Sequence, residues 1–177
     1  MPADMEHSAR EVVRLPHLHL CGIGTNLACH SGMAPDADNM AALSALADSR
    51  MPPIDQNTMR FWNRLVIDDG FEGMGLTDAE GDRLAGVLQG GKVLLMGNHG
   101  VLVAAANVAL ALDEMYYFER ACETLMLAYA TGRPLRIAPD HVAETTARQW
   151  AEYPRLALDH LAEVRAILDA EEPDYRD

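Results

Sequence analysis

Three histidines of this 177-residue chain stand where an imidazole could do chemistry, and His99 has the best-defined surroundings. It lies in the turn Gly-Asn-His-Gly at 97–100, between apolar runs at 93–96 and 101–105. Glycines allow such a turn backbone angles that other residues resist, so the chain can reverse and aim the imidazole. A histidine fixed between two buried strands is suited to bind a metal ion or to act as a general base. The alternative is a turn histidine that only caps the end of a strand.

The other two, His17 and His19, are separated by one residue in the segment Pro-His-Leu-His-Leu at 16–20. In an extended segment, side chains two residues apart point to the same face, so this pair can bind one ion together. Neutral imidazoles suit zinc and similar divalent ions. The alternative is two neighbouring histidines on a surface strand. His30, in an irregular stretch at 22–39, is a candidate substitute ligand, with a solvated loop histidine as the alternative.

The hydrophobic pattern predicts the strands that must hold these side chains. The apolar runs beside His99 indicate two short strands, the first of them buried on both faces, and residues 65–67 predict a third. Residues 55–62 are polar and then aromatic, as in segments that line a pocket or a subunit contact; the alternative is a surface turn leading into a strand. Strands interleaved with helices indicate an α/β domain.

Cap residues and apolar periodicity predict five helices. Asn39 is the expected N-cap of the first, Asn107 of the longest and Asp140 of the fourth. Thr77 and Glu80 match a capping box, in which the Thr77 hydroxyl accepts from the Glu80 amide while the Glu80 side chain reaches back. The predicted helices span residues 40–47, 78–88, 108–131, 141–150 and 155–170.

The composition argues against several classes of protein. A formal charge of −13 disfavours a nucleic-acid-binding surface, because phosphate contacts need clustered Lys and Arg. No apolar run approaches the roughly 20 residues needed to span a bilayer, and the first residues lack the features of a signal peptide. Three cysteines without Cys-x-x-Cys spacing fit reduced thiols. We therefore expect a cytoplasmic protein whose partners are small molecules or copies of itself.

Several segments match a known family in order and at natural spacing, and together they span about residues 41–131. Asn98-His99-Gly100 forms the centre of the longest segment. The chain resembles the class II aldolase/adducin-like proteins, whose members include L-fuculose-1-phosphate aldolase and L-ribulose-5-phosphate 4-epimerase. Residues 132–135 and 147–150 resemble one bacterial branch of that family. The matching segments are residues 42–48, 53–56, 81–84, 92–103 and 117–122.

The resemblance implies a fold and a cofactor. The fold is a three-layer α/β/α sandwich around a central β-sheet with C-terminal helices, usually assembled as a cyclic homotetramer with sites between subunits. The cofactor is a divalent metal ion, usually zinc, bound by a His-x-His pair and a later histidine. His99 matches the later histidine, and His17 and His19 are the candidates for the pair. The metal would act as a Lewis acid on a ketose phosphate and stabilise the enediolate formed as a carbon–carbon bond breaks.

The first part of the chain departs from the family pattern. About twenty residues separate His19 from Ala41, whereas the family's His-x-His runs almost directly into the segment that Ala41 begins. The family's phosphate loop and its acidic acid/base residue have no match here, so no catalytic residue is assigned. The acidic residues within reach in the sequence are Glu6, Glu11 and Asp36.

Two hypotheses follow for a chain divided into an irregular segment at 1–40, a class II aldolase-like core at 41–135 and a helical tail at 136–177. The first is a metal-dependent lyase acting on a sugar phosphate or similar small hydroxy-carbonyl compound. The second is a catalytically degenerate or truncated family member that serves as an oligomerisation or binding module. The first requires the three histidines to approach one another within about 4–5 Å, given metal–nitrogen bonds near 2 Å.

Overall fold

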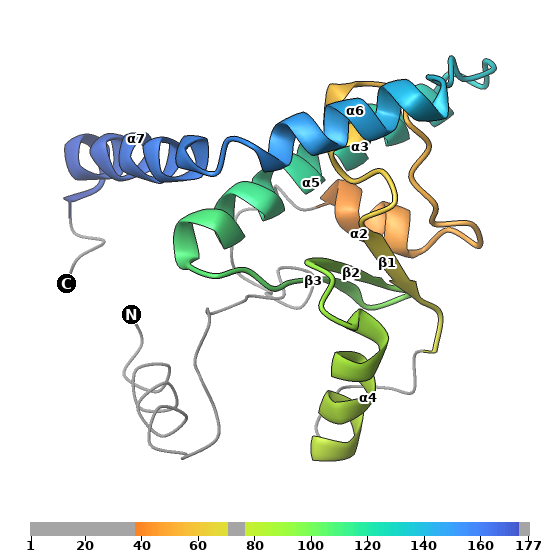
Figure 1. The fold of residues 1–177 in the computed structure, drawn as a ribbon, viewed down its shortest axis with the longest axis horizontal. Helices are drawn as coiled ribbons and strands as arrows, with labels where there is room; N and C mark the ends of the chain where they lie inside the picture. The colour runs from red at the N-terminus through yellow and green to blue at the C-terminus, as the bar shows by residue number, and fades with distance from the viewer. Residues whose placement is uncertain (1–37, 71–76, 174–177) are drawn as a thin grey trace.

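The computed structural model describes residues 38–70 and 77–173, and within them strands alternate with helices as predicted (Figure 1). The strands are β1 (Leu65–Asp68), β2 (Val93–Met96) and β3 (Gly100–Val103). The helices are α2 (Asp38–Ser44), α3 (Gln56–Arg60), α4 (Asp78–Leu88), α5 (Val108–Ala130), α6 (Asp140–Ala151) and α7 (Arg155–Glu171).

The central strand of the described sheet is β2. It pairs in parallel with β1, with Leu65 opposite Val93, and antiparallel with β3, with Met96 opposite Gly100. All four β2 residues are buried, which confirms the prediction of a strand covered on both faces. Because β2 and β3 form a hairpin, the turn that carries His99 is the hairpin loop.

Helices cover both faces of this sheet. Helices α2 and α5 pack against β3 on one face, and α4 contacts β1 on the other (Figure 1). The alternation of side chains along β1 agrees with this division: Leu65 packs against the main core, while Val66 lies beside Leu88 of α4. The described residues thus have the expected α/β/α layering.

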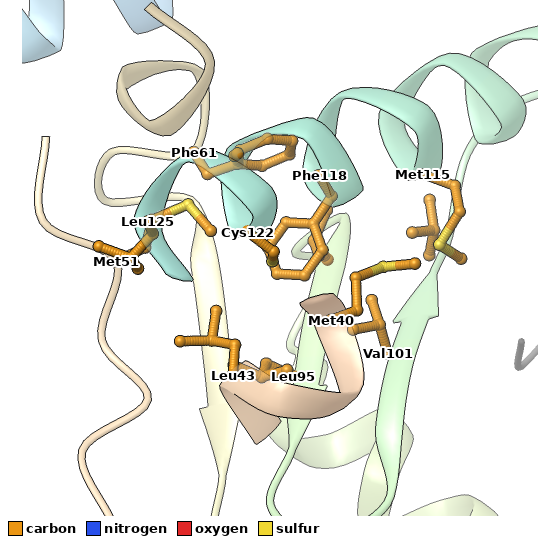
Figure 2. Close-up of a cluster of buried hydrophobic side chains, with 13 residues drawn as sticks. Met40, Leu43, Met51, Phe61, Leu95, Val101, Met115, Phe118, Cys122 and Leu125 are labelled. Atoms are coloured by element: carbon orange, nitrogen blue, oxygen red, sulfur yellow. The ribbon is translucent and has the colours of Figure 1, made fainter. Parts of the chain in front are cut away.

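The main hydrophobic core lies between the sheet and helices α2 and α5 (Figure 2). Phe118 of α5 is fully buried, and its ring meets that of Phe61 edge to face with centroids 5.0 Å apart. Burial also raises the pKa of the Cys122 thiol. Completely buried side chains of this size contribute about 1.5–3 kcal/mol each. Core residues shown in Figure 2 include Met40, Leu43, Met51, Leu95, Val101, Met115 and Leu125.

The predicted helix starts agree with the structure in part. The Asn107 side chain accepts from the Leu110 amide at the start of α5, as expected. The Thr77 hydroxyl accepts from the Glu80 amide, but the Glu80 carboxylate binds Arg83 instead of reaching back, so the capping box is incomplete. An ion pair with a guanidinium is a stronger attachment for this carboxylate than a single backbone amide.

Two cap predictions are wrong. Asn39 lies inside α2 rather than before it, and its side chain donates to a carboxylate of α5. Asp140 is the first residue of α6, whose N-cap is Pro139 with no side-chain hydrogen bond. Proline fixes an extended entry into a helix without a capping side chain, and an acidic residue in the first turn suits the helix dipole.

Residues 55–62 form a helix and its exit rather than a surface turn. Asp55 caps α3 by accepting from the Thr58 amide, and the Thr58 hydroxyl accepts in return from the Asp55 amide. Trp62, just beyond the helix, lines a pocket of about 500 Å³ beside β1. The pocket-lining interpretation of this segment is therefore the correct one for Trp62.

The last two helices extend from the core. Helix α6 packs on α3, and α7 packs on α5, although Ala157 is the single α7 residue that the structure buries. The exposed apolar side chains of α7 include Leu156, Leu158 and Ile167. Within the described residues, no helix is both long enough and apolar enough to span a bilayer.

Candidate metal site at the β2–β3 turn

The turn that carries His99 is fastened to three elements. The Gly97 amide donates to the Asp68 carbonyl at the end of β1 (2.8 Å), and the Asn98 amide donates to the Ser44 carbonyl at the end of α2 (2.9 Å). The His99 amide donates to the Met96 carbonyl of β2 (3.1 Å). Hydrogen bonds to β1, α2 and β2 thus fix the backbone that carries the half-buried His99.

The residues beside His99 have the conformations that a tight turn demands. Gly100 has φ 138°, a region that side-chain-bearing residues rarely adopt, and Asn98 has φ 56° in the left-handed region that asparagine tolerates. At Gly97, a Cβ atom would lie 3.4 Å from an Asp69 carboxylate oxygen and 3.5 Å from the Asp68 carbonyl oxygen, which are ordinary van der Waals contacts. The Gly-Asn-His-Gly turn therefore needs its second glycine for φ, whereas the space around its first glycine would admit a Cβ atom.

Two carboxylates near this turn are bound by one arginine. Arg83 of α4 donates to both oxygens of the buried Asp68 (2.9 and 2.7 Å) and to both oxygens of Glu80 (2.8 and 2.7 Å). These hydrogen bonds lower the pKa of both carboxyl groups, and the positive potential of His99 lowers that of Glu80 slightly further. Both groups are ionised at neutral pH, and each of their four oxygens accepts one hydrogen bond from Arg83.

The structure leaves the predicted histidine pair undecided. His17, His19 and the substitute His30 lie outside the described residues, so their distances to His99 stay predictions. Among residues 38–70 and 77–173, no three His, Cys, Asp or Glu side chains are grouped so that they could hold a metal ion. Among the described residues, His99 is therefore the one candidate ligand at this turn, and His17 and His19 stay predictions.

The role of Arg83 was missed in the sequence, although a signal was present. Asp68 follows a predicted strand directly, and parallel strands bring their carboxyl ends to the same edge of a sheet. That edge is also where β2 ends and the His99 turn begins. A polar residue at the end of one parallel strand is therefore a neighbour of a turn at the end of the next.

A second polar cluster also went unnoticed in the sequence. Arg60 of α3 donates to Asp113 (2.8 Å) and Glu114 (3.2 Å), and the second Asp113 oxygen lies 2.8 Å from Nδ1 of His160. The Arg60 guanidinium also lies over the Tyr117 ring, 4.7 Å from its centroid. This cluster joins three helices, and its charged groups are directed at one another.

Comparison with known proteins identifies the family. The model of the class II aldolase and adducin N-terminal domain matches residues 36–126, more than half of the chain. This chain belongs to the class II aldolase and adducin family. The match includes β1 to β3, the His99 turn and most of α5.

Curated relatives carry the names of different reactions. Decarboxylase NovR of Streptomyces niveus is 33% identical over 108 residues, covering 61% of this chain and 39% of its own. A putative aldolase class 2 protein of Caulobacter vibrioides is 28% identical over 150 residues, covering 84% and 58%. A 4-hydroxy-3-prenylphenylpyruvate oxygenase/4-hydroxy-3-prenylbenzoate synthase of Streptomyces roseochromogenus is 31% identical over 108 residues, covering 61% and 38%. The chain thus spans 38–58% of these relatives' lengths.

Solved structures show the same fold. An aldolase II superfamily protein from Pseudomonas syringae is 26% identical and superposes with a TM-score of 0.71, covering 82% of this chain and 57% of that one. L-fuculose 1-phosphate aldolase from Glaciozyma antarctica superposes with a TM-score of 0.59 at 19% identity, covering 75% and 50%. These neighbours confirm the predicted class II aldolase-like α/β fold.

Proposed function

We propose that this chain is a metal-dependent lyase that breaks a carbon–carbon bond next to a carbonyl group in a small hydroxy-carbonyl compound such as a sugar phosphate. The observation that carries the proposal is His99, half-buried on a turn anchored to β1, β2 and α2, in a member of the class II aldolase family. The relatives named decarboxylase and putative aldolase support a carbon–carbon lyase. Both reactions must stabilise the electron pair left on carbon.

The proposed ion is zinc, with His99, His17 and His19 as its ligands. Members of the family generally use a divalent metal ion. The His99 turn supplies a donor that fits, because imidazole is a usual zinc ligand. Beside it, Arg83 holds the carboxylates of Asp68 and Glu80 in hydrogen bonds. When bound, the ion would supply a Lewis acid that polarises the substrate's oxygens.

The described side chains have a defined share in this proposal. Arg83 holds Asp68 and Glu80 as hydrogen-bonded anions at the edge of the site. A carboxyl group whose pKa lies below its ordinary range is a poor proton donor at neutral pH. Neither Asp68 nor Glu80 is therefore assigned the acid/base role, and these two residues with Arg83 are positioning groups for the turn.

Metal content tests this proposal directly. Purified protein, incubated with zinc and dialysed, is expected to retain about one zinc per chain, because three neutral imidazoles form a tight site. His99→Ala should lose that zinc, whereas His141→Ala, which removes an exposed histidine of α6, should retain it. Zinc retained equally by wild type and His99→Ala, or absent from the wild type, would contradict the proposal.

The zinc-loaded protein would then be tested on two substrate classes. Sugar phosphates represent the aldol cleavage that we favour. Aromatic 2-oxo acids represent decarboxylation, because one relative is named a decarboxylase and another is named for a reaction of a phenylpyruvate. Release of an aldehyde from the first class supports the proposal as stated. Release of carbon dioxide from the second class would retain the metal-dependent lyase and reassign its substrate.

The second candidate function is an oligomerisation or binding module without catalysis. The exposed apolar side chains of α7 favour self-association, since a helix with few buried residues gains from a partner surface. We propose a homotetramer in either case. A protein that binds no zinc yet sediments as a tetramer would support the module over the lyase.

A further inference from the structure

A buried carboxylate on α5 reaches the start of α2. Glu119 is 5% exposed, and its oxygens accept from the Asn39 amide (3.3 Å), the Asn39 side-chain nitrogen (2.7 Å) and the Met40 amide (2.9 Å). Backbone amides in the first turn of a helix have no partner within the helix, and an anion there also suits the helix dipole. Glu119 therefore supplies, from a distant part of the chain, acceptors for the amides at the start of α2.

The other end of α2 reaches the candidate site. The Ser44 carbonyl, at the last residue of the helix, accepts from the Asn98 amide at 2.9 Å. Met40 and Leu43 hold the helix between these ends in the main core (Figure 2). One short helix thus joins the carboxylate of α5 to the residue that precedes His99.

We propose that Glu119 is a positioning residue for His99: through α2 it fixes the Ser44 carbonyl that holds Asn98 in its left-handed conformation, and so sets the direction of the His99 imidazole. Its consequence for metal binding rests on the function proposed above. The structural link from Glu119 through α2 to the turn does not depend on that function, because it follows from hydrogen bonds of described residues alone.

The chemistry of Glu119 explains why a carboxylate is needed here. Desolvation by burial raises its pKa, although the hydrogen bonds from Asn39 and Met40 oppose that rise. A glutamine of the same shape has one acceptor oxygen and one NH2 donor group. The NH2 group would therefore lie against an N–H donor of either Asn39 or Met40, and that hydrogen bond would be lost. Glu119→Gln therefore changes the cap while preserving the volume of the side chain.

Amide hydrogen exchange measured by NMR separates positioning from general stability. The Asn98 amide is bonded to α2, whereas the adjacent Gly97 amide is bonded to Asp68 of the sheet. In Glu119→Gln, we expect the Asn98 amide to exchange at least about tenfold faster. The reason is that α2, which carries the Ser44 carbonyl, has lost a hydrogen bond to a charged group at its start. The Gly97 amide should change by less than about twofold.

Two further variants keep this test decisive. Asn39→Ala removes one donor to Glu119 and leaves the carboxylate in place, so it should accelerate exchange of the Asn98 amide by a smaller factor. Glu123→Gln, on the same helix but paired with Arg120 at the surface, should change neither amide. Equal acceleration of the Gly97 and Asn98 amides, or acceleration of neither, would overturn the proposal.

Measuring zinc affinity distinguishes a failure of this inference from a failure of the proposed function. If the site binds zinc, Glu119→Gln should weaken it about tenfold or more, in the range seen when groups that orient metal ligands are removed. Wild-type protein that binds no zinc would remove the proposed function and leave the exchange result standing. Zinc bound equally by wild type and Glu119→Gln would overturn the positioning role.

Discussion

Two arginines of this protein each join two carboxylates, in surroundings that differ in burial. Arg60 pairs with Asp113 and Glu114 and has a side chain only 8% exposed, whereas Arg83 pairs with Asp68 and Glu80 and is 30% exposed. The first cluster ties helices of the core together. The second ties α4 to the end of β1, beside the His99 turn. The comparison separates a buried charge cluster that joins helices from a more exposed one that lies beside the candidate site.

Burial decides what each arginine contributes. Around Arg60, water is excluded and the guanidinium lies against aromatic rings, at 4.7 Å from the Tyr117 centroid and 4.9 Å from that of Trp150. One of its nitrogens, Nη1, is buried and has no hydrogen-bond partner among the residues that the structure describes. The faces of the Tyr117 and Trp150 rings lie beside the guanidinium. Arg83 is more exposed to solvent, which weakens its ion pairs, although its partner Asp68 is buried.

The largest expected effect is that of Arg60→Met. Removing one member of a buried ion pair leaves Asp113 charged and desolvated, which costs about 3–5 kcal/mol of unfolding free energy. Urea denaturation measures this loss. Arg64→Met is the matched control, because Arg64 pairs with Glu144 near the surface and should cost about 0–1 kcal/mol. Losses of similar size in the two variants would refute the distinction between a buried and an exposed cluster.

The second effect concerns acid stability and Arg83. Asp68 and Glu80 have pKa values lowered by Arg83, so between the folded and unfolded pKa values the unfolded chain binds more protons. Their stabilisation is present above the ordinary carboxyl pKa of about 4 and is lost as the pH falls through the folded values. Arg83→Met should therefore lower stability at pH 7 and flatten its decline between pH 5 and 3.

Urea midpoints at pH 7, 5, 4 and 3 measure that difference in slope. Arg148→Met provides the control, since its partner Glu152 is exposed and neither lies near β1. An unchanged slope in Arg83→Met would mean that Arg83 does not hold these carboxylates in solution. A changed slope in both variants would point to net charge rather than to this cluster.

The elements of the fold were readable from the sequence because local rules specify them. Neighbouring residues alone determine three features that the structure confirms. They are the apolar run of β2, the Asn107 cap of α5 and the end of α5 just before Gly132. The Gly-Asn-His-Gly turn was readable for the same reason. The metal-binding role predicted for His99 stays a prediction, because its proposed partners lie outside the described residues.

Two contacts of charged side chains were not readable because they join residues far apart in the chain. Glu119 caps a helix 79 residues earlier, and Arg60 pairs with Asp113 over 53 residues. Glutamate and arginine on an amphipathic helix are also compatible with solvation or helix pairing. Tertiary contacts therefore decide the role of these charges, and a spacing rule within one helix cannot.

The smallest expected effect tests whether the contact of His160 with Asp113 contributes to the stability of the fold. Its Nδ1 lies 2.8 Å from Asp113, and its side chain is 25% exposed at the contact between α5 and α7. Because Arg60 still binds the other Asp113 oxygen, His160→Gln should cost only about 0.5–1.5 kcal/mol of unfolding free energy. His141→Gln, at an exposed site on α6, should leave the urea midpoint unchanged. In the Arg60→Met background the cost of His160→Gln should grow. Of the two partners that the structure shows for the Asp113 carboxylate, Arg60 and His160, only His160 then remains. A double-mutant cycle measures this coupling. A cost that is the same in both backgrounds would show that the histidine and the arginine act on Asp113 independently.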